Sequence, residues 1–261
     1  MEIMLADSHA HLLDERLRGR IDEIVGSFKK DGLDFVVEVG AGIEESFQAL
    51  ELAKQYEAIY CTLGVHPHYA CEYTGNKYEN WVRSVLPHNK VVAIGECGLD
   101  FHYMLSPQDS QIDVFERQIK LSHEVGLPLV VHSREAAKET LDILKKYKEI
   151  LTKGILVHCY SYGVDELQAF SRELDCYFAF GGAITYKKTE MMVEALKACP
   201  RDRLMLETDC PYLAPCPVRG TVNEPKNVNI IAEFVAKTLE TSVDEVARIT
   251  LENTKRFYKI K

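Results

Sequence analysis

Short apolar, β-branched runs alternate along the chain with longer segments of mixed polarity, and this alternation constrains the fold more than any other feature. Several intervening segments, such as 108–125, repeat apolar residues with the period of an α-helix. Apolar strands that alternate with helices indicate a parallel sheet covered by helices. Eight such units in 261 residues predict an α/β fold, a (β/α)8 TIM barrel. The expected strands are 3–7, 35–39, 59–63, 91–96, 129–132, 155–158, 177–180 and 204–207.

A doubly wound open sheet is the main structural alternative, but no G-x-G-x-x-G follows any expected strand. No linker, low-complexity tract or charge run divides the chain, so we expect residues 1–261 to form a single domain. Apolar residues at 46% and charged residues at 27% exclude a disordered or fibrous chain. No apolar run is long enough for a membrane helix, and no secretory signal is visible at the start. A cytoplasmic protein is therefore expected.

The charge balance limits how this chain binds its partners. Its formal net charge is −9, whereas a protein that binds nucleic acid by general neutralisation of phosphates is basic. We therefore expect no stable non-specific binding to nucleic acid, and any contact with it is confined to a local site. The sequence leaves the oligomeric state open.

Polar residues gather where the expected strands end, and in a parallel barrel these ends build the active site. His9 and His11 are two residues apart, so on a strand both imidazoles point the same way. Imidazole and carboxylate groups are ligands of divalent cations. A single histidine at such a position is more often a hydrogen-bonded core residue, but the joint set predicts a metal site. Its expected ligands are His9, His11, Glu96, His132, His158 and Asp209.

Four histidines and two carboxylates exceed the three protein ligands of a catalytic zinc ion. Two divalent ions bridged by a carboxylate would use the whole set. Glu96 is the expected bridge because its strand lies between the two groups of histidines; an ion pair with Arg134 is the alternative. Asp209 and Glu96 are the candidate catalytic residues, and Asp209 is expected to orient a water molecule and accept its proton.

Four more residues are candidates for substrate contact. For two of them, His66 and His68 beside Pro67, stabilisation of the turn is the alternative role. Arg134 opens a helix, so capping or local pairing is its alternative. Arg219 and Lys226 are expected to form a small basic rim on an acidic body with Tyr186-Lys187-Lys188, and a solvated loop is the alternative for that triplet. The candidate substrate-binding residues are thus His66, His68, Arg134 and Arg219.

An ordered series of motifs resembles the TatD family of metal-dependent deoxyribonucleases, in the amidohydrolase-like barrel superfamily. The resemblance runs from residue 7 to residue 258, almost the whole chain. HCYSYG departs mildly from the form HCFSG, and no ligand position is altered. The motifs are DSHAHL (7–12), GVHPH (64–68), GECGLDFH (95–102), VHSREA (131–136), HCYSYG (158–163), ETDCPYLAP (207–215), RGTVNEPKNV (219–228) and ENTKRFY (252–258).

The resemblance implies a hydrolase of phosphodiester bonds with two divalent ions per chain. By the family's pattern, His9, His11, Glu96 and Asp209 would hold one ion, and Glu96, His132 and His158 the other. The implied activity is a 3′-5′ exonuclease on single-stranded or terminal DNA, with RNA as a further polymer. Magnesium or manganese are the implied working ions, and zinc is a candidate occupant in crystals.

Two other functions stay open at this point. A dinuclear hydrolase of a carboxylic ester or amide, such as a deacylase or lactonase, would use similar metal chemistry. Related amidohydrolases commonly bridge their metals with a carbamylated lysine, whereas the fourth strand here ends in Glu96, which favours the nuclease. A non-catalytic metal-binding or nucleic-acid-binding protein predicts a degraded ligand set or a strongly basic surface, and the sequence shows neither.

Overall fold

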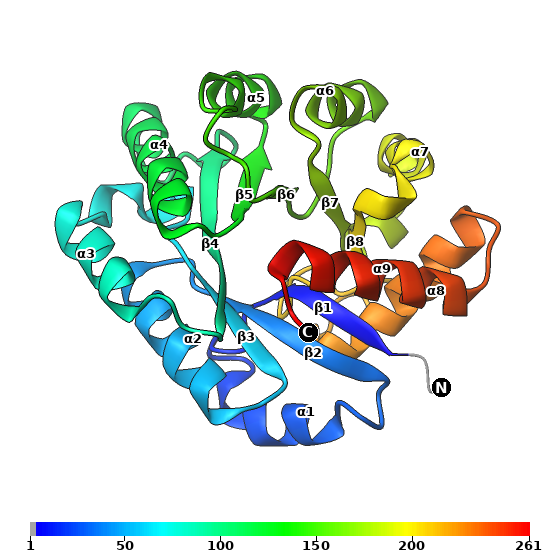
Figure 1. The fold of residues 1–261 in the computed structure, drawn as a ribbon. Helices are drawn as coiled ribbons and strands as arrows, with labels where there is room; N and C mark the ends of the chain where they lie inside the picture. The colour runs from blue at the N-terminus through cyan, green and yellow to red at the C-terminus, as the bar shows by residue number, and fades with distance from the viewer. Residues whose placement is uncertain (1–3) are drawn as a thin grey trace. The chain divides into compact units, whose positions relative to one another are not determined.

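The computed structural model describes residues 4–261, and its strands follow one another in chain order from β1 to β8 (Figure 1). All eight expected strands are present, although Ile3 of the first lies outside the described residues. β4 continues four residues beyond its expected end at Glu96. The strands are β1 (Leu5–Ala10), β2 (Leu33–Val39), β3 (Ile59–Leu63), β4 (Val91–Asp100), β5 (Leu129–Arg134), β6 (Ile155–Val157), β7 (Tyr177–Phe180) and β8 (Leu204–Leu206).

Helices separate the strands, as the (β/α)8 prediction requires, and α4 has the bounds expected from its apolar period. Within residues 4–261, no helix is both long and apolar enough to span a membrane. The α-helices are α1 (Ile21–Ser27), α2 (Ile43–Gln55), α3 (Asn76–Val85), α4 (Gln108–Val125), α5 (Ala137–Lys146), α6 (Val164–Leu174), α7 (Glu190–Ala198), α8 (Val228–Thr238) and α9 (Val243–Tyr258). The 3-10 helices are η1 (Arg18–Arg20), η2 (Pro67–Glu72), η3 (Gly182–Thr185), η4 (Arg201–Arg203) and η5 (Pro225–Asn227).

The chain divides into two compact units, each built from segments that are distant in sequence. Unit 1 comprises the chain up to Glu38 together with Cys159–Gln168 and Tyr177–Lys261. Unit 2 comprises Val39–His158 and Ala169–Cys176. The expectation of a single domain over 1–261 stays a prediction.

In unit 2, β4 pairs in parallel with β3 and β5, and all ten of its residues are buried. α2 packs against β3 and α4 against β4 (Figure 1). Two buried glutamines of α4 bond the backbone of neighbouring segments. Gln118 bonds both the N–H and the C=O of Val65, and Gln111 does the same for Asp100. α4 therefore holds in place the two segments that carry His66 and the end of β4.

In unit 1, β1 pairs with β2 and β7 with β8, and α9 packs against β1 and β8. Polar side chains fix the strand ends. Asp7 accepts a hydrogen bond from the backbone N–H of Thr208, and Glu38 accepts from those of Leu12 and Leu13. The Tyr258 hydroxyl of α9 donates to the Ser8 carbonyl oxygen. These bonds align the end of β1 with the segment that follows β8.

β4 and β5 approach so closely at Gly98 that a side chain has no room there. Gly98 has φ of 140°, and a Cβ at this position would lie 2.0 Å from the carbonyl oxygen of His132. Both the backbone conformation and the lack of space require glycine. The spacing of Glu96 and Asp100 along β4 therefore depends on a glycine between them.

We expect Gly98→Ala to lower the free energy of unfolding by about 2–4 kcal/mol, because the new methyl group forces the strands apart and strains the backbone. Urea denaturation followed by circular dichroism measures the change. Gly26→Ala in α1 is the control, since a Cβ there meets nothing within 4 Å and alanine favours a helix by about 0.5–1 kcal/mol. Equal stability of the Gly98 variant and the wild type would contradict the close approach.

Candidate functional site

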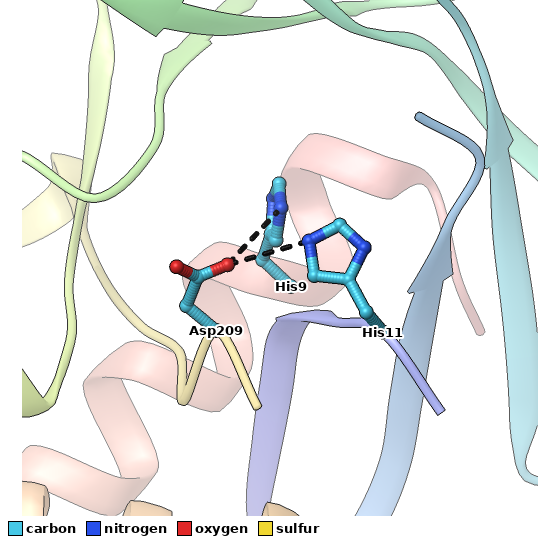
Figure 2. A group of neighbouring side chains, drawn as sticks. All are labelled: His9, His11 and Asp209. Atoms are coloured by element: carbon cyan, nitrogen blue, oxygen red, sulfur yellow. Dashed lines mark ion pairs between the residues drawn. The ribbon is translucent and has the colours of Figure 1, made fainter. Parts of the chain in front are cut away.

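A first group of possible metal ligands, the unit 1 cluster, consists of His9, His11 and Asp209 (Figure 2). The Nε2 atoms of His9 and His11 lie 3.8 and 3.4 Å from Oδ1 of Asp209. The His9 side chain is fully buried, whereas those of His11 and Asp209 are 17% and 15% exposed. The cluster thus has a closed side at His9 and an open side at His11 and Asp209.

Local backbone geometry explains why these three side chains meet. His9 lies in β1 and His11 follows it, so the two-residue period of a strand turns both rings the same way. Asp209 follows β8 and has a left-handed φ of 54°. Its N–H donates to the carbonyl oxygen of His9, and the N–H of His11 donates to that of Cys210. The Nδ2 group of Asn223 bonds the carbonyl oxygens of Thr208 and Tyr212, on either side of Asp209.

A second group, the unit 2 cluster, consists of His66, Glu96, His132 and His158. Three imidazoles converge on Oε1 of Glu96, whose side chain is only 4% exposed. The distances from this oxygen are 2.6 Å to Nε2 of His158, 2.9 Å to Nδ1 of His132 and 3.5 Å to Nε2 of His66. His66, expected as a substrate contact, thus lies beside the expected ligands of this unit.

Asp100, for which the sequence predicted no role, contacts two histidines at the edge of the unit 2 cluster. Its Oδ2 lies 3.0 Å from Nε2 of His68 and 3.2 Å from Nε2 of His132. Its Oδ1 accepts hydrogen bonds from the backbone N–H groups of His102 and Tyr103. The available signal was a second carboxylate in GECGLD, an even number of residues after Glu96. Asp100 stands in the quoted motif but was given no role there.

Burial and these contacts shift the pKa values of Asp100, His132 and His66. Burial alone would raise the pKa of Asp100, but hydrogen bonds from His132, Tyr103 and His68 outweigh it and hold that pKa below its usual value. Burial alone would lower the pKa of His132, but its bonds to Asp100 and Glu96 raise it. Burial lowers the pKa of His66 well below its usual value, so this ring is neutral at neutral pH. Neutral imidazole is the form that binds metal.

The donor atoms suit a divalent cation in both clusters. The ligand atoms of His9, His11 and Asp209 lie within 4.8 Å of one another, and so do those of His66, Glu96 and His132. Imidazole nitrogens mixed with carboxylate oxygens suit zinc, manganese and iron, and carboxylates also suit magnesium. An ionised Asp100 can only accept hydrogen bonds, so it places a proton on Nε2 of His132 and leaves Nδ1 to face Glu96. The residues present therefore fit a metal site.

The two arginines expected to contact substrate are both exposed, and each covers a tyrosine ring. The Cζ atom of Arg134 lies 4.7 Å from the ring centroid of Tyr103 in unit 2. That of Arg219 lies 4.2 Å from the ring of Tyr186 in unit 1. His68 also contacts Tyr103, with ring centroids 5.5 Å apart. The structure thus brings His68 and Arg134 to one aromatic side chain, and their role in substrate binding stays a prediction.

Comparison with known proteins identifies a family of metal-dependent hydrolases. The family model for the TatD related DNases matches residues 6–259. The uncharacterized metal-dependent hydrolase YabD of Bacillus subtilis is 39% identical over 257 residues, which cover 98% of this chain and 100% of that protein. The 3′-5′ ssDNA/RNA exonuclease TatD of Edwardsiella piscicida is 31% identical over 262 residues, with 98% of this chain and 100% of that protein covered.

A similar solved structure supports the fold. The TatD homologue YJJV of Escherichia coli K12 superposes with a TM-score of 0.91 over the whole of both chains, at 24% identity. The predicted (β/α)8 fold is therefore confirmed, and so is the family resemblance. The chain belongs to the TatD family and is a metal-dependent hydrolase.

Proposed function

We propose that this hydrolase is a nuclease that cleaves phosphodiester bonds of single-stranded or terminal DNA, from the 3′ end, with RNA as a further substrate. The observation that carries the proposal is the pair of histidine and carboxylate clusters in a chain 31% identical, over nearly its full length, to a 3′-5′ ssDNA/RNA exonuclease. The TatD related DNase family as a whole points to the same chemistry.

In this proposal each cluster holds a divalent ion, magnesium or manganese in the working enzyme. His9, His11 and Asp209 are the ligands from unit 1, and Glu96, His132 and His158 those from unit 2. The role of Glu96 as a bridge between the two ions remains a prediction from the family's pattern. When bound, such ions supply a water molecule of lowered pKa and a positive charge for the phosphate oxygens.

The chain's own residues perform the remaining steps. Asp209 orients the attacking water and accepts its proton, because a carboxylate has two oxygens and its side chain is partly exposed. Arg134 and Arg219 bind phosphate oxygens with exposed guanidinium groups. His68, which is partly exposed in unit 2, contacts the leaving group of the substrate. These local contacts suit a protein with net charge −9, which cannot hold DNA by general attraction.

Metal binding in unit 2 is expected to depend on Asp100. Asp100→Asn weakens the orientation of His132, so the affinity for manganese measured by calorimetry falls about 10–100-fold. Asp113→Asn is the control, since Asp113 is exposed and pairs only with Arg117 in the described structure. Thermal melting of both variants separates a loss of metal from a loss of fold. Unchanged affinity in a folded Asp100 variant would contradict this role.

Nuclease activity is expected to require both clusters. With magnesium or manganese, the wild type should shorten a 5′-labelled single-stranded DNA into a ladder, and Asp209→Asn and Glu96→Gln should each reduce the rate about 100-fold or more. Denaturing gel electrophoresis measures the products. Asp202→Asn, at an exposed site in unit 1, is the control and should cleave normally.

Two results would overturn the proposed function. One is intact DNA and RNA in every metal, while the wild type still binds metal ions. The other is metal-dependent turnover of carboxylic esters or amides without any cleavage of phosphodiesters, which would establish the acyl hydrolase instead.

A further inference from the structure

Three consecutive large side chains are exposed in the loop after β4. Tyr103, Met104 and Leu105 are 53%, 44% and 67% exposed. Exposed apolar side chains that occur singly are normal, but a contiguous group marks an interaction surface. Among the described residues, the Tyr103 hydroxyl has no hydrogen-bond partner, whereas those of Tyr186 and Tyr212 bond Ala214 and Asp14. Tyr103 therefore has a half-exposed side chain whose hydroxyl bonds none of the described residues.

The Tyr103 ring contacts one guanidinium group and two imidazoles. The Arg134 guanidinium covers the ring at 4.7 Å, and the imidazoles of His68 and His102 meet it edge to face. The nearby acid, Glu135, is bonded to Nδ1 of His102. An aromatic ring next to a guanidinium plane is the chemistry that binds an unpaired nucleobase together with its phosphate.

Asp100 links the unit 2 cluster to the backbone of Tyr103. One oxygen of Asp100 accepts the N–H of Tyr103 at 2.8 Å, and the other lies 3.2 Å from Nε2 of His132. Tyr103 is thus held by the same carboxylate that orients a candidate ligand. A base stacked on this ring would belong to a nucleotide next to the bond that is cleaved.

We propose that Tyr103, supported by Arg134, is a platform on which an unpaired nucleobase of the substrate stacks. The inference rests on the proposed nuclease function and adds a subsite to it. Stacking requires a base that is not paired, so the platform gives the enzyme a preference for single strands and frayed ends. Because every base has an aromatic face, the platform selects little for sequence.

The test compares two short, 5′-fluorescent single strands that differ only at the 3′ end, where one carries bases and the other abasic residues. Fluorescence anisotropy with EDTA-treated protein measures binding without cleavage. We expect the wild type to bind the strand with bases about tenfold more tightly. Tyr103→Ala should bind both strands equally, and Tyr103→Phe, which keeps the ring, should behave as the wild type.

A matched control is Tyr60→Leu, because Tyr60 also carries a cation over its ring, the Lys90 ammonium at 4.8 Å, but lies near the start of β3. It should keep the tenfold difference. Strands with deoxyribose and with ribose show whether the platform serves DNA, RNA or both. In steady-state assays with manganese, Tyr103→Ala should raise KM for the strand with bases and leave KM for the abasic strand unchanged.

The outcomes separate this inference from the function on which it rests. If the wild type cleaves DNA but Tyr103→Ala still favours bases tenfold, the platform is overturned and the nuclease stands. If the wild type neither binds nor cleaves either strand, both are overturned. A Tyr103→Ala protein that loses the preference but keeps its melting temperature supports the platform.

Discussion

Two buried carboxylates on one strand, Glu96 and Asp100, organise the half of the molecule that carries most of its histidines. A buried charge is costly unless it is paired and hydrogen-bonded. Glu96 meets this requirement with three imidazoles, and Asp100 with two imidazoles and two backbone N–H groups. The surrounding segments must therefore bring donors to β4, and the buried glutamines of α4 hold two of those segments in place.

The same contacts also fix the orientation of candidate metal ligands before a substrate binds. Nε2 of His132 is hydrogen-bonded to Asp100, and Nδ1 faces Glu96. The imidazole ring therefore cannot rotate freely. Groups that are oriented before a substrate arrives lose little freedom during the reaction. In unit 1, backbone bonds between the end of β1 and the residues after β8 achieve the same result for His9, His11 and Asp209.

Much of the site could be predicted from sequence because it depends on local periodicity. The alternating runs located all eight strands, and the two-residue spacing of His9 and His11 placed both rings on one side of β1. The expected end of β4 at Glu96 was wrong by four residues, because the strand continues through Gly98 to Asp100. The strand continues there because Gly98 permits a close approach to β5 that no other residue would allow.

By itself, the sequence determined the order of strands and helices, the residue types at the strand ends and the family to which the chain belongs. The order of strands and helices follows from spacing along the chain, and the family was indicated by the resemblance of an ordered series of motifs. Only the tertiary structure decided that His66 joins Glu96, that Asp100 links His132 to the loop of Tyr103, and that Arg134 covers that ring. Except for the bond between Asp100 and Tyr103, which spans three residues, these contacts join residues about 30 positions apart. They depend on strand register and side-chain direction, which no local pattern encodes.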